Sequence, residues 1–375
     1  MFLRLLTLFF LLSETERIRA EAEEEDDLTY GLYLDISYAD DLGGATKNLP
    51  WRSKLTTNVL NAFDPNMGMG YLIKTATPKS PWGFEFGLHD GNDMVGQPPT
   101  PGQPPVPGEK ALLYVSRLNA SYLAPIGKGL KFTAGLMNSF IGYESMYAGN
   151  NPNYTRAWLA DYSPYFLIGA GAEYQARDNL KLSFYLLTDY YYLAVIGDQP
   201  KYGSQVKWGF APEWTLTQNI FVGAEQSDSN FAYWRGFSDS ILEWKKDDWL
   251  VAMAYDIGTE KRPSSGLQTL WMGSAIWARW HISGPWSIAA RPEIYWDPDG
   301  ELTGYQQFIG AMTLTAEYRL TIGPTQTLLR TEFRHDTSTG PQGGFYNASS
   351  ATAQLVPNQN LLFFALIWSI DNPHE

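Results

Sequence analysis

The sequence predicts an all-β fold, a transmembrane antiparallel up-and-down β-barrel of about 16 strands, with a range of roughly 14 to 18. Segments of about ten residues alternate apolar and polar side chains, as in residues 180–186 and 310–320, and a period of two is typical of a strand. The connectors between these segments alternate between short and long. After the first dozen residues, no apolar run reaches the roughly 18 residues that a transmembrane helix needs.

The composition suits a barrel in lipid and argues against a nucleic-acid-binding protein. Of the 375 residues, 44% are hydrophobic and 15% are aromatic, and a barrel can place aromatic rings outward at both membrane interfaces. The net charge is −13, so the chain has no basic surplus to neutralise phosphates. The absence of cysteine is compatible with passage through an oxidising periplasm.

The N-terminus is typical of a secretory signal peptide over residues 1–22. Arg4 precedes an apolar run at residues 5–12, and Ala20 and Ala22 supply small residues near a cleavage position. A wrongly assigned start and a short buried helix are the alternatives. Residues 23–27 are an acidic stretch that we expect to form a periplasmic leader, before a barrel over residues 28–370 and a polar tail over 371–375.

The first half of the barrel follows from alternation interrupted by turn residues. The predicted strands are 28–39, 67–77, 82–89, 110–124, 130–140, 164–175, 180–193 and 203–216. Residues 55–61 either extend the second strand or compete with it. Residues 91–108 are rich in proline, which removes ladder donors, and are therefore a loop rather than a strand.

The second half continues the same pattern to the C-terminus. The predicted strands are 219–226, 234–244, 249–258, 269–282, 286–296, 305–322, 327–336 and 360–370. The short connectors are 78–81, 125–129, 177–179, 217–218, 245–248, 283–285 and 323–325. Short turns of membrane barrels face the periplasm and long loops face outside, so an even strand number predicts that both termini are periplasmic.

Charged residues keep to one parity of the strands. Arg291 and Glu293 share a face that lies opposite Ile288 and Ile294. A Lys or Arg facing mid-bilayer lipid costs about 2–4 kcal/mol, so the charged parity must line an aqueous lumen and the aromatic parity must face lipid. About 16 strands enclose a channel wide enough for water. The predicted lumen-lining residues are Arg117, Lys131, Glu173, Lys207, Glu213, Arg291, Glu293, Glu317, Arg319, Arg330, Glu332, Arg334 and Asp336.

One long connector, at about residues 141–162, is the candidate for a pore constriction. It carries Glu144, Arg156 and Asp161 among tyrosines and tryptophans. If it folds into the lumen, opposite charges near the pore axis would focus a transverse field and select among solutes. The alternative is a surface loop that packs on the barrel rim.

No motif points to catalysis, a cofactor or a metal. Residues 297–301 resemble part of a calcium loop, but the remaining ligand spacing is missing and an Asp-Gly turn is the better interpretation. The four histidines are scattered without metal-ligand spacing. A nucleophile elbow, a phosphate-binding loop and a dinucleotide fingerprint are all absent from the sequence. We therefore expect no catalytic residue, no metal and no cofactor, and a protein that is not an enzyme.

Two stretches resemble the OmpL-like β-barrel porins of the porin-2 group. One comprises residues 142–144, 153–156 and 164–166, and the other comprises residues 330–336 before an apolar closing strand. The resemblance implies a porin-like protein of the outer membrane. The chain departs from the usual barrel by lacking a terminal aromatic residue, so the signal for the barrel-assembly machinery is expected at Phe364, Trp368 and Ile370.

These observations lead to one principal hypothesis and two alternatives. The first is a passive channel for small hydrophilic solutes or ions across a bacterial outer membrane, with membrane lipid and the barrel-assembly machinery as its partners. A homotrimer remains open, because apolar outward patches suit lipid and subunit contacts alike. The alternatives are a barrel that does not conduct freely, such as an adhesin or scaffold, and a secreted soluble β-rich protein that binds carbohydrate.

Overall fold

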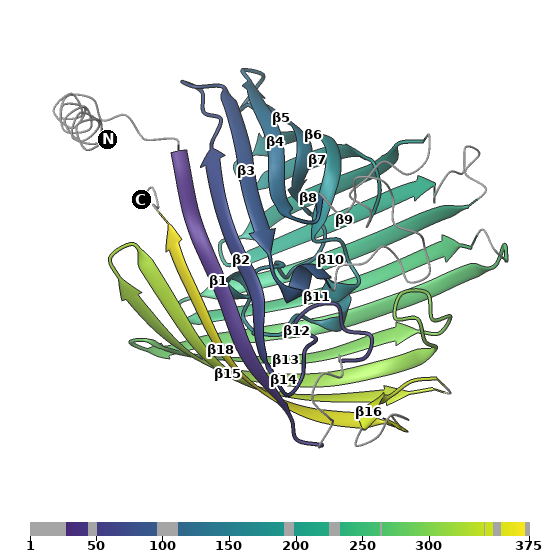
Figure 1. Ribbon diagram of the computed structural model, residues 1–375. Coiled ribbons are helices and arrows are strands. Elements are labelled where there is room, and N and C mark those ends of the chain that lie inside the picture. The colour runs from purple at the N-terminus through teal and green to yellow at the C-terminus, as the bar shows by residue number, and fades with distance from the viewer. Residues whose placement is uncertain are drawn as a thin grey trace, which may run out of the picture.

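The computed structural model describes residues 28–43, 51–95, 112–190, 199–224, 233–262, 265–340, 342–347 and 354–371. Sixteen strands in these ranges form one closed antiparallel barrel, which confirms the predicted class and strand number (Figure 1). The predicted signal peptide, the acidic leader and most of the tail lie outside the described residues. No helix in the described ranges is long and apolar enough to serve as a membrane span.

The barrel strands follow each other around the ring in sequence order, as Figure 1 shows. They are β1 (Leu28–Asp41), β2 (Phe63–Lys74), β3 (Trp82–Asp90), β4 (Val115–Ala124), β5 (Leu130–Asn138), β6 (Phe166–Arg177), β7 (Leu180–Leu187), β8 (Lys201–Ala211), β9 (Trp214–Ala224), β10 (Trp234–Lys246), β11 (Trp249–Lys261), β12 (Gln268–Ser283), β13 (Trp286–Asp297), β14 (Gln307–Ile322), β15 (Thr325–Thr339) and β18 (Asn358–Asp371). A small hairpin, β16 (Phe345–Asn347) with β17 (Gln354–Val356), lies in the last long connector.

The first and last barrel strands pair with each other and so close the ring. Gly31 of β1 lies opposite Asp371 of β18, and the register continues along both strands. The two ends of the described barrel therefore lie at the same rim. This rim also carries the short turns, and it is called the short-turn end below; the opposite rim is the long-loop end.

One predicted turn is wrong. Residues 217–218 were expected to join two strands, but the chain turns at residues 212–213, and Thr217 lies inside β9, paired with Lys207 and Ile241. Pro212 suits a turn because its ring fixes φ and it has no backbone N–H to donate. Polar side chains at 217 and 218 imitate a turn, but Thr217 lies on the polar inner face and Gln218 hydrogen-bonds to Ser238 and Ser240 of β10.

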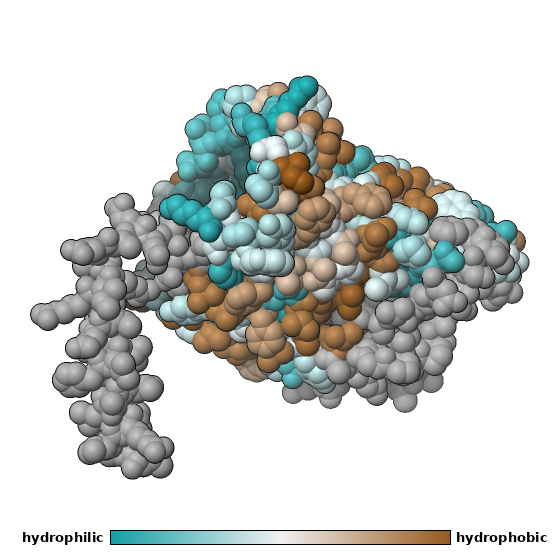
Figure 2. All heavy atoms as spheres, turned by 90° about the horizontal axis from the view of Figure 1, so that it is seen from above, coloured by the Kyte–Doolittle hydropathy of each residue, from teal (hydrophilic) through white to brown (hydrophobic). Residues whose placement is uncertain are grey.

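The outer and inner faces alternate as predicted. On β13, Ile288, Ile294 and Trp296 point outward and are 43%, 50% and 40% exposed, whereas Arg291 and Glu293 point inward and are buried. Figure 2 shows a broad apolar surface on the wall turned to the viewer, with hydrophilic residues gathered toward its borders. This is the arrangement that a wall in lipid requires.

Tryptophan marks the short-turn end of the outer wall. Four strands that begin directly after a short turn each start with this residue: Trp82, Trp214, Trp249 and Trp286. Trp249 stacks on Trp280 at 5.3 Å between ring centroids, and Trp286 meets Tyr318 at 4.9 Å. Aromatic rings at one level of the wall are typical of the interface between lipid and water.

The interior contains two long connectors that fold into the barrel. They are residues 139–165, which join β5 to β6 and are called the lumen segment below, and residues 51–61, the β1–β2 loop. The loop forms no strand, so residues 55–61 neither extend β2 nor compete with it. Both connectors are largely buried against the inner wall.

Candidate pore constriction

The lumen segment is buried although it is a connector. It contains a 3₁₀ turn, η1 (Ala148–Asn150), and one helical turn, α4 (Trp158–Asp161). Tyr154, Arg156 and Trp158 are each at most 1% exposed. A buried connector must satisfy its backbone polar groups without a regular ladder, and here charged side chains of the inner wall do so.

The segment begins on the wall of β10. The backbone N–H of Gly142 donates to Oδ2 of Asp239 at 2.8 Å. The hydroxyl of the next residue, Tyr143, donates to Oε2 of Glu243 at 3.0 Å. Gly142 has φ +90°, a left-handed conformation that favours glycine. These contacts direct the segment away from β5 and across the lumen.

Glu144 connects the segment to β12 and β13. Its Oε1 accepts hydrogen bonds from the indole Nε1 of Trp277 and from Nη1 of Arg291, both at 2.7 Å. Its Oε2 accepts the backbone N–H of Ala157 at 2.5 Å. One buried carboxylate thus joins the start of the segment, its later part and the barrel wall.

Arg330 of β15 holds the middle of the segment. Its guanidinium donates to the carbonyl oxygens of Ala148, Asn151 and Asn153 at 2.8, 2.9 and 3.1 Å. It also pairs with Glu317 of β14 at 2.6 Å. The five donors of a planar guanidinium suit this task, since several carbonyls can be bound at once.

Tyr154 and Thr155, farther along the segment, are held by β15 and β1. Glu332 accepts the backbone N–H groups of Tyr154 and Thr155 at 2.6 and 2.9 Å, and the hydroxyl of Thr315 at 2.7 Å. The hydroxyl of Tyr154 donates to Oδ1 of Asp35 on β1 at 2.9 Å. The segment therefore spans the lumen from β10 to β1.

Trp158 of α4 is fixed by two wall carboxylates. Glu293 accepts its backbone N–H at 2.6 Å, and Asp336 accepts its indole N–H at 2.8 Å. Arg334 lies between these carboxylates, 2.9 Å from each, and donates to the carbonyl of Arg156 at 3.0 Å. The alternating charges on β13 and β15 therefore act together as a docking surface for the segment.

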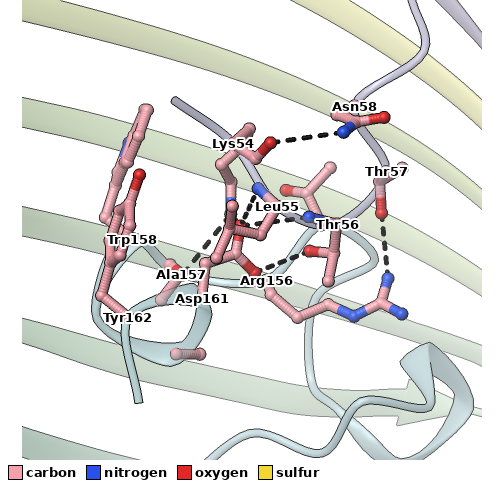
Figure 3. Close-up of polar contacts among 12 residues, drawn as sticks. Lys54, Leu55, Thr56, Thr57, Asn58, Arg156, Ala157, Trp158, Asp161 and Tyr162 are labelled. Atoms are coloured by element: carbon pink, nitrogen blue, oxygen red, sulfur yellow. Dashed lines mark hydrogen bonds and ion pairs between the residues drawn. The ribbon is translucent and has the colours of Figure 1, made fainter. Parts of the chain in front are cut away.

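The β1–β2 loop packs against the lumen segment through one further ion pair and one hydrogen bond. Figure 3 shows Lys54 directed at Asp161, with Nζ–Oδ2 at 2.5 Å, and Arg156 directed at Thr57, whose hydroxyl lies 2.9 Å from Nη1. Arg156 also pairs with Asp93 of the short helix α2 (Asn92–Val95) at 2.6 Å. Three connectors are thus locked together inside the barrel.

The carboxyls at this junction differ in their electrostatics. Burial by itself raises the pKa of Asp161, but the Lys54 ammonium and the Thr56 hydroxyl outweigh it and hold the pKa below its usual value. Burial also raises the pKa of Asp93, and there the attraction of Arg156 does not fully offset it. Asp161 is therefore the more firmly ionised of the two.

The structure brings all three predicted constriction residues into the barrel interior. Glu144, Arg156 and Asp161 are 6%, 0% and 1% exposed. Each forms a close ion pair, with Arg291, Asp93 and Lys54 respectively. Their charges are compensated by neighbours at the junction, and their effect on solutes stays a prediction.

The predicted lumen-lining residues divide into two groups. Those buried against the lumen segment or beside it are Arg291, Glu293, Glu317, Arg330, Glu332, Arg334 and Asp336. Those elsewhere on the inner wall are Arg117, 5.0 Å from the ring of Tyr71, and Lys131, Glu173, Lys207 and Arg319. Glu213 is not on the wall, since it lies in the turn between β8 and β9, 3.5 Å from Lys246.

The described part of the barrel contains two cavities lined by polar residues. One of about 420 Å³ lies at the short-turn end and is lined by charged side chains that include Lys245, Arg279 and Arg319. The other, of about 240 Å³, lies against the lumen segment and is lined by Tyr143, Glu144 and its neighbours. Only the second cavity is lined by residues of the segment, so water and small solutes can lie beside the segment there.

Sequence reasoning missed the residues that the β1–β2 loop contributes. Lys54 is a buried partner of the lumen segment, and Trp51 packs on Trp158 with 6.0 Å between ring centroids. Asp93 of α2, a second buried partner, was missed as well. A signal was present, because a connector with Trp51 and Lys54 is richer in large side chains than a solvated loop requires. Sequence reasoning also missed Asp239, which accepts the backbone N–H of Gly142.

The whole barrel sequence matches one family model. Residues 27–370 match the model described as "Putative beta-barrel porin-2, OmpL-like". The comparison with curated proteins found no match. Because the family match covers nearly the whole chain, it includes the lumen segment and every wall strand.

Several solved structures share the fold. The anion-selective porin from Comamonas acidovorans is 10% identical, with a TM-score of 0.59, over 92% of this chain and 99% of that one. The outer membrane channel DcaP of Acinetobacter baumannii is 9% identical, with a TM-score of 0.55, over 92% of this chain and 96% of that one. The trimer form of OmpT from Vibrio cholerae is 10% identical, with a TM-score of 0.51, over 91% and 98%. Identities this low establish similarity of fold alone.

Proposed function

This chain belongs to the OmpL-like β-barrel porins of the porin-2 group, and from that membership we propose that it is a narrow passive channel for small hydrophilic solutes or ions. It is a porin of the bacterial outer membrane. The proposal concerns how the channel works: the lumen segment reduces its cross-section, and the charges of the inner wall influence which solutes pass. The family is one of channels rather than enzymes, and we expect no catalytic activity.

The observation that carries this proposal is the position of the lumen segment. It contacts β10, β12, β13, β15 and β1, so that it crosses the interior rather than lying along one wall. A solute must therefore pass between the segment and the remaining wall. At its start the segment also contacts β7 and β8, where Phe140 stacks on Tyr185 and its carbonyl accepts from Gln205. Nearer the short turns, β5 to β8 carry partly exposed charges at Lys131, Glu173, Lys181 and Lys207.

A second candidate function rests on the same segment. Its ion pairs are buried and mutually compensated, which also suits a barrel that does not conduct freely and serves as a scaffold or adhesin. The two candidates differ in whether solute passes while the segment remains docked. The cavity of about 240 Å³ against the segment and the polar cavity of about 420 Å³ at the short-turn end favour the channel.

The outer wall suits lipid and leaves room for a subunit contact. An apolar groove of about 520 Å³ runs over β12 to β15 and is lined in part by Trp280, Ala290 and Leu314. OmpT from Vibrio cholerae has been described in a trimer form, and we propose that a homotrimer of this chain is one use of such a groove. The closing strand presents Phe364 outward, and we propose that Phe364, Trp368 and Ile370 are the residues that the barrel-assembly machinery recognises during insertion.

Planar-bilayer recording tests the proposed channel. Purified, correctly folded protein should add discrete conductance steps to a lipid bilayer, and reversal potentials in a salt gradient should report its ion preference. Folded protein that inserts without adding conductance would overturn the channel and favour the scaffold. Removal of the signal peptide, which we propose lies at residues 1–22, can be checked by N-terminal sequencing of the exported protein.

A further inference from the structure

Two carboxyl groups face each other on the inner wall where the lumen segment begins. Asp239 of β10 and Asp256 of β11 are direct partners in the antiparallel register. They are 0% and 1% exposed. Direct partners on one face of an antiparallel pair have Cβ atoms about 4.5–5.5 Å apart, so the two carboxyls lie side by side. They can hydrogen-bond to each other only when one carries a proton, because two carboxylates have only acceptors.

Neither carboxyl has a cationic partner among the described residues. The Oδ1 atoms of Asp239 and Asp256 are both buried and receive no hydrogen bond from an N–H or O–H group of that part of the chain. Oδ2 of Asp239 accepts from neutral donors, Nδ2 of Asn219 and the backbone N–H of Gly142, each at 2.8 Å. Two adjacent negative charges without a counter-ion are strongly disfavoured in a buried site.

The ionisable groups around the pair are engaged elsewhere. On β9 the facing residue is the neutral Asn219, and on β12 the residue opposite Asp256 is Gly273. The nearest charged groups on the packed elements each have another partner: Glu243 of β10 binds Tyr143, Glu260 of β11 binds Arg235, and Glu144 of the lumen segment binds Arg291. The cations Arg235 and Arg291 are therefore paired with these glutamates and not with Asp239 or Asp256.

We propose that Asp239 and Asp256 share one proton, and that this proton positions the start of the lumen segment. With the proton in place, Asp239 is held by Asp256 on one side and holds the N–H of Gly142 on the other. When alkaline pH removes the proton, two carboxylates are left side by side and repel each other. The displacement of Asp239 then loosens the attachment of the segment, so that its docking depends on pH.

Asp239 and Asp256 lie where a change in their protonation can affect the start of the lumen segment. Gly142 is the first residue of the segment to touch β10, and the neighbouring Tyr143 depends on the same strand through Glu243. The larger docking surface on β13 and β15 lies on other strands and consists of compensated ion pairs. A change at Asp239 therefore acts on the start of the segment while the remaining contacts keep it inside the barrel.

Infrared spectroscopy detects the proton directly. The protein in detergent at neutral pH should show a carboxylic-acid carbonyl band, and the Asp256→Asn variant should lose it, because the amide keeps the hydrogen bond to Asp239 without titrating. The matched control is Asp297→Asn, because Asp297 is a buried carboxylate that accepts four hydrogen bonds from residues 301–303. A band that survives in Asp256→Asn and disappears in the control would overturn the assignment.

A pH titration of the unmodified protein completes the test. The band should fade as the pH rises. The melting temperature of the wild type should fall from above the usual aspartate pKa of about 3.9 up to the pH at which the band has faded, whereas that of Asp256→Asn should stay level. The absence of a band at any pH, or parallel melting curves, would overturn the shared proton. Neither readout needs ion conduction, so these results remain separate from those that decide whether the barrel is a channel.

Discussion

Glu144 of the lumen segment and Arg291 of β13 form an ion pair with 2.7 Å between Oε1 and Nη1, and neither side chain is exposed. Arg291 also donates to the carbonyl of Thr155 at 2.5 Å, so one guanidinium binds two distant parts of the segment. A connector can therefore replace water inside the barrel, because the wall supplies charged partners for its backbone as well as its side chains.

Removing one member of this pair should destabilise the barrel. In Glu144→Ala the Arg291 charge stays buried with less compensation, and breaking such a pair costs about 3–5 kcal/mol. We expect the lower part of this range, because Glu293 still lies 3.3 Å from Arg291. Denaturant unfolding in detergent measures the loss.

The double variant Glu144→Ala with Arg291→Met provides the control for that measurement. It removes both charges, so its loss should be smaller than the sum of the two single losses. Additive losses would mean that the two residues act independently and that the ion pair does not hold the segment.

The lumen segment should also control conductance. The double variant Glu144→Ala with Arg156→Ala removes two of its charges and their contacts with β13 and α2, so the segment should dock less firmly. We expect a changed single-channel conductance or ion preference in planar bilayers. Glu213→Ala, in the turn between β8 and β9, is the control that should leave both quantities unchanged. If the double variant also conducts like the wild type, the segment does not limit the pore.

The barrel itself could be predicted because each strand separates two solvents. Ile294 faces outward and Glu293 faces inward. Along each strand, apolar and polar residues therefore alternate with a period of two, and the sequence shows this alternation. The turn at 217–218 was predicted wrongly for a related reason. Thr217 faces the polar interior, and Gln218 hydrogen-bonds to two serines of β10, so a polar pair inside a strand looks like a turn.

The docking of the connectors could not be predicted in the same way. Lys54 and Asp161 are 107 positions apart in the sequence, and no periodic pattern joins them. The sequence indicated that residues 141–162 carry both charge signs, but it did not show which charges meet. Partner choice depends on the closed ring, which brings β1, β10 and β15 around one segment.

The assignment of faces can be tested with arginine. Leu314 of β14 points outward and is 47% exposed, so Leu314→Arg places a cation against lipid and should cost about 2–4 kcal/mol. Thr217 of β9 is on the inner face, where Thr217→Arg places the cation toward water and should cost less, since the like charge of its partner Lys207 adds at most about 1 kcal/mol. Folding yield and unfolding free energy in lipid vesicles would be compared. Equal losses at the two sites would contradict the assigned faces.

The junction of the β1–β2 loop with α4 should weaken in acid. The pKa of Asp161 is lower in the folded protein than its usual value of about 3.9, although burial opposes this, because Lys54 and Thr56 favour the carboxylate. A depressed folded-state pKa adds stability at pH values above the unfolded pKa, and that stability is lost as the pH falls toward the folded pKa. Asp161→Asn should therefore melt below the wild type at neutral pH, with the gap narrowing below about pH 4.

Melting temperatures measured in detergent between neutral and acidic pH test this narrowing. Asp248→Asn, in the exposed turn between β10 and β11, measures the general effect of removing one carboxylate and should run parallel to the wild type. The sign follows from the ion pair with Lys54 at 2.5 Å, since a protonated Asp161 no longer compensates the buried ammonium. A gap that stays constant or widens in acid would show that Asp161 contributes through packing rather than through its charge.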